Sequence, residues 1–452
     1  MIALLDFVGG IFGLLVGARI GQALTRYHFE AKDDVGRNQV WWTGLTIVVC
    51  TASTFLLVTM LFRDTLAYWI LGPTVQQGGF FFALILPTVC LSIAHQVLDV
   101  YLRVRKWSGT SVGVNFFRLA LNIGLNVYFL AVLDLGVTGV LAGNLIAGVV
   151  GTSILFVIFL KNQGWYSFHY PLVEKLMRFA GPLVLTALLS LLMHQSGRYL
   201  LRFFVDLDQV GIYSLAYMIG QGVYTLCFLP FTMIWGVMMY EIADRPDAKQ
   251  TYVWVFEYTT YGLALIFFGA ALFAEPVLGL MVNSEYMPAT RMIPIICLAY
   301  LFFSMHDHFK VPVLLTKSTS SVVPVAALAA LTNIGANFLL IPNFGMMGAA
   351  WASVIAYGVY SMVGLWRYRK IDKYDYPLWK CLVIILGMVA SYGMYDRVAQ
   401  IEGIPGGPLS LAIFLWLGWL FILFGSFIHQ LAARYVWVPV RNLTSSSRDH
   451  SR

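Results

Sequence analysis

Apolar runs of about 20 residues recur along the whole chain, and short polar segments separate them. A helix rises 1.5 Å per residue, so such a run is long enough to cross the hydrocarbon core of a bilayer, which is about 30 Å thick. The pattern predicts an all-α polytopic membrane protein with about 13 transmembrane helices. The predicted spans are residues 2–22, 39–62, 78–102, 110–132, 137–160, 179–201, 209–236, 253–282, 292–315, 319–341, 345–366, 378–395 and 408–430.

The composition agrees with this pattern. Of the 452 residues, 59% are hydrophobic and only 11% are charged, whereas about a quarter of a soluble domain is charged. This excludes a soluble enzyme, a disordered protein and a fibrous protein. No connection on the outer side is longer than about 15 residues, which leaves no room there for a catalytic domain. We expect neither a cofactor nor a metal site.

Lysine and arginine are distributed unequally between the two sets of connections. One set, with the C-terminal tail, holds 21 of them, and the other set holds four. Cytoplasmic connections carry this excess in membrane proteins, so we predict that the C-terminus is cytoplasmic. The same bias explains the net charge of +7, and we therefore expect no nucleic acid partner.

Part of the sequence repeats at an offset of 211 residues. The segment Asn122-Ile123-Gly124-Leu125-Asn126 recurs as Asn333-Ile334-Gly335-Ala336-Asn337. Duplicated halves are common in transporters, so the repeat predicts two pseudo-symmetric lobes. The further matching pairs, the last two at an offset of 209, are His95 with His306, Lys106 with Lys317, Gly136 with Gly345, and Gly139 with Gly348.

The repeat also predicts where the domains begin and end. The second half opens with span 179–201, whose partner in the first half would lie before Met1, so the first half is one helix short. We expect either a start further upstream or a naturally shortened protein. The predicted domains are an N-terminal lobe of five helices (1–160), a C-terminal lobe of six (161–371), a terminal helix pair (372–437) and a disordered cytoplasmic tail (438–452).

Polar residues within the predicted spans follow helical spacing. Each ionisable group costs about 2.5–3.5 kcal/mol near the bilayer centre, so it usually faces a cavity or a partner. One stripe is Thr186, Ser190, His194, Arg198 and Arg202, and a second is Asn115, Arg118, Asn122 and Asn126. We predict that Arg198, Arg118, His194, Arg202 and Asn122 line a hydrophilic cavity and bind substrate.

Polar residues in spans can also serve a purely structural purpose. Asparagine stripes join membrane helices to one another, and Arg202 could extend to the interface. Asp307 with Lys310, and Asp99 with Arg103, could be structural ion pairs. We nevertheless take Asp307 and Glu257, with His194, as candidates for ion coupling.

Three segments resemble the O-antigen and polysaccharide flippases (Wzx-like) of the multidrug/oligosaccharidyl-lipid/polysaccharide exporter superfamily. They are residues 198–217, with Val210-Gly211-Ile212-Tyr213-Ser214, then Asn337 to Ala350, and Gly21 to Tyr27. The resemblance implies 14 helices in two six-helix lobes and a terminal pair. An acidic residue often precedes the arginine that matches Arg198 in that family, whereas this chain has Gly197 there.

The resemblance implies a flippase in the bacterial inner membrane that moves undecaprenyl-diphosphate-linked oligosaccharides by alternating access. Guanidinium groups suit this cargo because they bind phosphate through several donors in a fixed fork. The implied partners are the lipid-linked oligosaccharide, membrane lipids, H⁺ or Na⁺ as the coupling ion, and a polysaccharide polymerase. The alternatives are a cation-coupled multidrug exporter of the same superfamily and a membrane enzyme of polysaccharide assembly.

Overall fold

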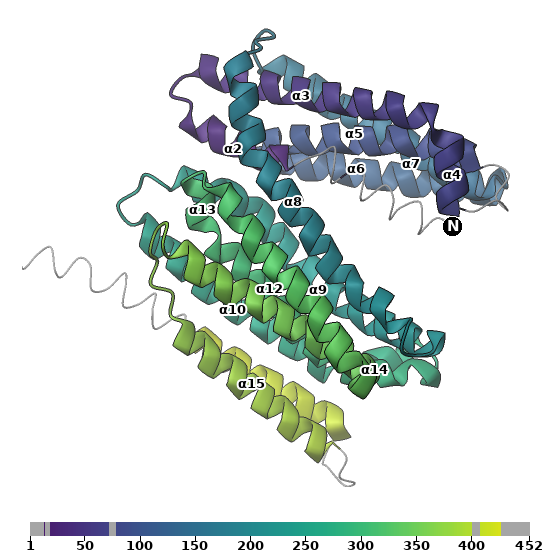
Figure 1. Ribbon diagram of the computed structural model, residues 1–452, viewed down its shortest axis with the longest axis vertical. Coiled ribbons are helices and arrows are strands. Elements are labelled where there is room, and N and C mark those ends of the chain that lie inside the picture. The colour runs from purple at the N-terminus through teal and green to yellow at the C-terminus, as the bar shows by residue number, and fades with distance from the viewer. Residues whose placement is uncertain (1–12, 14–18, 72–77, 400–406, 426–452) are drawn as a thin grey trace, which may run out of the picture. The chain divides into compact units, whose positions relative to one another are not determined.

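The computed structural model describes residue 13 and residues 19–71, 78–399 and 407–425. These residues are almost all helical, and no strand occurs among them. Figure 1 shows the helices coloured along the chain. The predicted tail at 438–452 and most of the predicted span at 2–22 lie outside the described residues.

The helices follow one another with short connections. A cap is visible where α3 begins, because the carboxylate of Asp33 accepts a hydrogen bond of 2.8 Å from the amide of Gly36, as N-cap residues do. The first half contains α2 (Ile20–Glu30), α3 (Asp34–Leu61), α4 (Arg63–Leu71), α5 (Gly78–Val104), α6 (Ser108–Val127), the π-helix η1 (Tyr128–Val132) and α7 (Gly136–Asn162). The remainder contains α8 (Tyr170–Leu201), α9 (Leu207–Glu241), α10 (Ala248–Leu272), α11 (Ala274–Met281), the 3-10 helix η2 (Ser284–Arg291), α12 (Ile293–Phe309), α13 (Val311–Leu315), the 3-10 helix η3 (Thr319–Ser321), α14 (Val322–Tyr368), α15 (Leu378–Val398) and a last helix over 407–425.

Ten of the described helical segments are long and apolar enough to cross a membrane. Helix α14 has 47 residues, or about 70 Å at 1.5 Å per residue, which is enough for two crossings. It is interrupted at Gly345, whose φ of 53° and ψ of −131° are not helical. Counting α14 twice, and η2 with α12 and α13 as one bent span, gives twelve crossings among the described residues. The prediction of an all-α polytopic protein with about 13 spans is confirmed.

Two predicted spans are interrupted in the structure. Span 253–282 is divided into α10 and α11, with Phe273 between them, where Pro276 follows and lacks a backbone donor. Span 292–315 is divided into α12 and α13, with Lys310 between them, and η2, which comes before this span, is bent by 44° from the segment Ile293–Leu315. Apolar periodicity does not reveal the break at Phe273, because α10 and α11 on its two sides are both hydrophobic.

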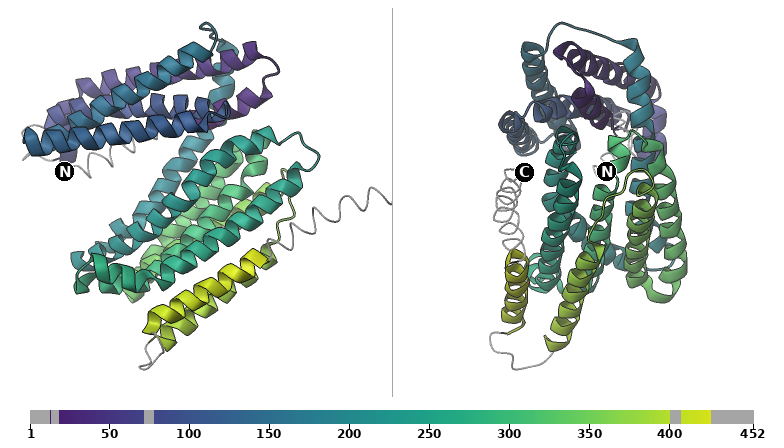
Figure 2. Two further views of the ribbon diagram at one scale, coloured as in Figure 1. Left: turned by 180° about the vertical axis from the view of Figure 1, so that it is seen from behind. Right: turned by 90° about the vertical axis from the view of Figure 1, so that its left-hand side faces the viewer.

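The described chain packs as two compact units that do not follow chain order. The first unit comprises Met1–Leu192, Met233–Asp244 and Val313–Ala327, and the second comprises Met193–Thr232, Arg245–Pro312 and Leu328–Arg452. In the first unit, α5 packs against α3, α4 and α7, and α6 packs against α7 (Figure 1). In the second, α10 packs against α12 and α15 (Figure 2). The domain boundaries at 160, 371 and 437 stay a prediction.

Positions that the repeat matches share an unusual backbone. Lys106 and Lys317 have φ values of 62° and 60°, a left-handed conformation that costs about 1–2 kcal/mol in residues other than glycine. After each lysine the next amide bonds back across the turn, Trp107 to the carbonyl of Leu102 at 2.9 Å and Ser318 to that of Val313 at 3.0 Å. Both are Schellman-type helix ends. Gly136 and Gly345 are also matched, with φ of 55° and 53°, and the coincidence of these turns supports a duplicated chain.

Candidate functional site

A buried polar network joins three helices of the first unit around Asp99 of α5. The carboxylate of Asp99 accepts hydrogen bonds from the hydroxyl of Ser111 and, at 3.1 Å, from Asn115 Nδ2. It also forms a 2.9 Å ion pair with Arg103. His95 Nε2 lies 2.9 Å from Asn115 Oδ1, and Thr152 of α7 lies 3.5 Å from His95 Nδ1. Since Asp99 is only 8% exposed, these donors compensate its charge in place of water.

Arg118 and Asn122, two predicted substrate-binding residues, both face α7 from α6. The aliphatic part of Arg118 lies against Gly151, where an added Cβ would come within 2.9 Å of Arg118 Cδ. Asn122 Nδ2 donates to Asn144 Oδ1 at 2.7 Å, and Asn126 Nδ2 lies 3.3 Å from Asn122 Oδ1. Asn122 therefore joins helices in this structure, which is the alternative that the sequence left open.

His194 of α8 lies at the centre of a second cluster. Its Nδ1 is 2.5 Å from the hydroxyl of Tyr357 in α14 and 3.1 Å from the hydroxyl of Tyr217 in α9. The two hydroxyl groups are 2.9 Å apart, so the three polar atoms form a closed triangle. Tyr300 and Phe303 of α12 flank the imidazole, at ring-centroid distances of 5.8 Å and 4.9 Å.

Arg198 lies one helical turn after His194 and shares a partner with it. Its guanidinium carbon is 4.8 Å from the centre of the Tyr217 ring, a cation–π distance. Its Nε is buried and has no hydrogen-bond partner among the described residues. Tyr217 thus contacts His194 through its hydroxyl and Arg198 through its ring, and this arrangement leaves donors of Arg198 available for an anion.

A third polar group lies on the same part of α8. The hydroxyl of Ser196 donates to Asn333 Oδ1 in α14, and Asn337 Nδ2 donates to the same oxygen at 3.1 Å. Both asparagines are fully buried. Asn333 and Asn337 match Asn122 and Asn126 of the first half, and in each half the pair joins its helix to a neighbour.

The two carboxylates predicted to couple ions have cationic neighbours. Asp307 pairs with Lys310 three residues later. Glu257 is buried, accepts a 2.9 Å hydrogen bond from the hydroxyl of Tyr261 and lies 3.5 Å from Lys380 Nζ. These contacts agree with structural ion pairs and leave a coupling role as a prediction.

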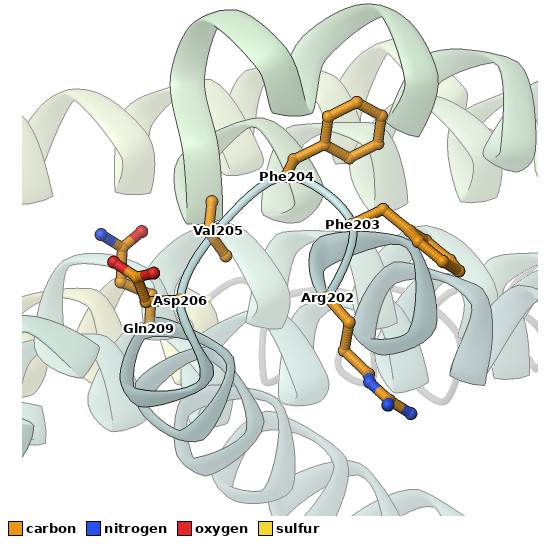
Figure 3. A pocket seen from close by; sticks show the side chains of 6 residues that line it. All are labelled: Arg202, Phe203, Phe204, Val205, Asp206 and Gln209. Atoms are coloured by element: carbon orange, nitrogen blue, oxygen red, sulfur yellow. The ribbon is translucent and has the colours of Figure 1, made fainter.

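Arg202 lies where α8 ends, beside an open depression of about 370 Å³. In Figure 3 its side chain extends away from Asp206 and Gln209 on the opposite side of the loop. The remaining lining residues are Phe203, Phe204 and Val205. Arg202 is exposed, so it is separated from the buried cluster around His194.

The structure therefore brings His194 and Arg198 together, and it places Arg202 at the helix end. The common cavity predicted for Arg118 and Arg198 stays a prediction. Tyr217 and Tyr357 were not predicted from the sequence. A signal for them exists, because a tyrosine deep within a span needs a hydrogen-bond partner for its hydroxyl, and Tyr213, Tyr217 and Tyr224 recur at helical spacing.

Comparison with known proteins indicates the family. Residues 4–235, which are half of the chain, match the model of a family described as polysaccharide biosynthesis proteins. No curated protein matches the sequence.

The fold is that of multidrug transporters. The MATE transporter VcmN from Vibrio cholerae, in a mutant form, has a TM-score of 0.66 at 18% identity, with 81% of this chain and 86% of that chain covered. An outward-facing multidrug resistance MATE family transporter of the MOP superfamily has a TM-score of 0.70 at 16% identity, with 82% and 87% covered. The prediction of a membrane transporter rather than an enzyme is confirmed at the level of family and fold.

Proposed function

Because the chain belongs to the family of polysaccharide biosynthesis proteins and has a transporter fold, we propose that it flips lipid-linked oligosaccharides across the membrane. The family match carries this proposal, since solved structures of such low identity indicate the fold alone. The cargo would be an undecaprenyl-diphosphate-linked repeat unit in the bacterial inner membrane, with the C-terminus of the flippase in the cytoplasm and a polymerase using the exported unit.

The chemistry around Arg198 suits such a cargo. A diphosphate offers several anionic oxygens, which a guanidinium binds in a planar fork. The ring of Tyr217 holds one face of Arg198 at 4.8 Å, so the guanidinium edge is available to a ligand. Arg118, His194, Arg202 and Asn122 complete the proposed binding set. Tyrosine and asparagine would supply donors and acceptors for the sugars.

Coupling to H⁺ or Na⁺ belongs to the same proposal. A single ionisable group within a span can sense such a gradient. Asp307, Glu257 and His194 are the candidates. Transport in proteoliposomes should respond to a pH or sodium gradient, and transport that is indifferent to both would refute coupling.

The direct test is reconstitution with a fluorescent undecaprenyl-diphosphate oligosaccharide and a reagent that modifies only the outer leaflet. The wild-type chain should move the lipid between leaflets, and Arg198→Ala should lose most of this activity. Arg291→Ala is a matched control, because Arg291 is exposed in η2. Equal lipid movement with and without the wild-type protein would refute the proposal.

Multidrug export is the second candidate, and two observations favour it. The similar structures are multidrug transporters, and aromatic rings surround His194. A site for cationic drugs also needs an available carboxylate, whereas Asp99 accepts from Ser111, Asn115 and Arg103. Efflux of a cationic dye by the reconstituted protein, with no movement of the lipid-linked oligosaccharide, would favour this candidate.

A further inference from the structure

Two ion pairs in the first unit are related to each other by the internal repeat. Lys106 Nζ lies 2.6 Å from Glu241 Oε1, and Lys317 Nζ lies 2.6 Å from Glu30 Oε2. Lys106 and Lys317 are 211 residues apart, and so are Glu30 and Glu241. In each pair, the lysine therefore belongs to one half of the repeat and the glutamate to the other.

The backbone fixes both lysines in the same way. Each is the left-handed residue of a Schellman-type helix end, Lys106 after α5 and Lys317 after α13. Each glutamate lies at the last residue of its helix, Glu30 in α2 and Glu241 in α9. The crossed arrangement therefore rests on four helix ends, and two independent backbone features repeat along with it.

Further contacts at the same place also join the two halves. Arg26 Nη2 donates to the carbonyl of Leu315 at 3.0 Å, and its guanidinium carbon lies 5.7 Å from the centre of the Tyr240 ring. Lys317 Nζ also lies 4.9 Å from the centre of the Tyr27 ring. The helix ends of the second half are thus tied to α2 and to the turn after α5 by cationic groups.

All four charged residues of the crossed pairs lie in connections that the lysine and arginine bias assigns to the cytoplasmic side. We propose that Lys106–Glu241 and Lys317–Glu30 form a reciprocal latch that holds the two halves together at the cytoplasmic face and must open when the transporter opens to the cytoplasm. This role rests on the proposed function as an alternating-access transporter.

The exposure of the pairs fits a latch that opens and closes. The side chains of Lys106 and Glu241 are 70% and 34% exposed, and those of Lys317 and Glu30 are 35% and 44% exposed. Exposed ion pairs are weak and sensitive to salt. Together the two should shift the equilibrium between closed and open forms by roughly two- to thirtyfold, which biases the closed form without locking it.

The test measures a distance and needs no substrate. Spin labels at Thr110→Cys and Asp244→Cys, in the full chain with its five native cysteines replaced, report the separation of the α5–α6 turn from the end of α9. The double variant Glu30→Gln with Glu241→Gln should raise the long-distance population by roughly two- to thirtyfold. In the labelled parent chain, the exchange Lys106→Glu with Glu241→Lys keeps both pairs, one of them reversed, and should therefore keep the short distance.

A matched control removes an ion pair that lies within one half. Asp34→Asn breaks the 3.2 Å pair with Arg37 inside α3 and should leave the distances unchanged. If the glutamine variant does not fold, about 1 M salt applied to the labelled parent chain should still produce the shift, because salt screens exposed pairs. The latch is refuted if neither neutralisation nor salt changes the distances, or if the charge exchange lengthens them as neutralisation does.

This result is distinguishable from failure of the proposed function. If the latch responds as expected but the protein moves no lipid-linked oligosaccharide, the latch is supported and the proposed cargo is refuted. If the protein moves the lipid-linked oligosaccharide but the latch does not respond, the proposed cargo is supported and the latch is refuted.

Discussion

The Nδ1 atom of His194 lies 2.5 Å from the hydroxyl of Tyr357, although 163 positions separate these residues in the chain. The contact joins α8 to α14, and Tyr217 of α9 closes it into a triangle. Three helices are therefore fixed to one another at a single buried point. We therefore expect that the loss of this contact lowers the free energy of unfolding.

Tyr357→Phe tests the structural role of this contact. The substitution leaves the ring in place but removes the hydroxyl, so Tyr217 and His194 each lose a buried partner. We expect a loss of about 1–3 kcal/mol, which is typical of a buried polar group left unsatisfied. The midpoint of thermal unfolding in detergent should fall. Tyr199→Phe, at an exposed position of the same helix as His194, should leave it unchanged.

Arg198→Lys tests whether the shape of the guanidinium matters or only its charge. Lysine keeps the positive charge but loses the planar fork and much of the stacking on Tyr217. We expect transport to fall by about tenfold, corresponding to about 1.4 kcal/mol, and to fall further in Arg198→Ala. Both variants should reach the membrane in normal amounts. Equal transport by the lysine variant and the wild type would indicate that charge alone suffices.

Acidification should destabilise the end of α2 through His28, which lies beyond the predicted span 2–22. Trp41 Nε1 donates to His28 Nδ1 at 3.0 Å, and burial, with a smaller contribution from the charge of Arg37, lowers the pKa of His28 to about 4. Between about pH 6.5 and pH 4, His28 is protonated in the unfolded chain but neutral in the folded chain. The free energy of unfolding therefore falls as the pH falls. The loss should be about 2 kcal/mol at about pH 5.

The pH dependence of thermal unfolding measures this effect. His28→Gln keeps an acceptor for Trp41 but cannot be protonated, so it should remove most of the loss between about pH 7 and pH 5. His169→Gln, at an exposed position, should retain the loss. A profile of His28→Gln that matches the wild type would assign the acid sensitivity to another group.

Gly345→Ala tests the break within α14. At φ 53° and ψ −131° a side chain is strained, at a cost of about 1–3 kcal/mol. The unfolding midpoint should therefore fall. Gly335→Ala in the same helix is the matched control, because an added Cβ there meets no atom within 4 Å. It should be neutral or stabilising, since alanine favours helix over glycine by about 1 kcal/mol.

The sequence predicts the helices well because membrane crossing imposes a length and a composition that are visible without any partner. Pro342 and Gly345 mark the boundary between the predicted spans 319–341 and 345–366, and the structure interrupts α14 at Gly345. The repeat of Asn122 and Asn126 as Asn333 and Asn337 is equally visible. In each case the information is local, or recurs at one fixed offset.

The contacts of the site are less predictable because they depend on which helix faces which. Helical spacing places His194 and Arg198 on one side of α8, but nothing in that spacing indicates that Tyr217 contacts both of them. The crossed ion pairs show the same limit. The offset of 211 also relates Glu30 to Glu241, yet only packing reveals that each glutamate contacts the lysine of the other half.

The ion pairs of Asp99 with Arg103 and of Asp307 with Lys310 each lie within a single helical turn or at its end. Such pairs can close as soon as that segment of the chain has been synthesised, before any neighbouring helix has entered the membrane. Each acid would then meet lipid already neutralised, which lowers the cost of insertion. Neither carboxylate therefore depends on a later helix for its cationic partner. Each would stay paired even if the later helices assembled incorrectly.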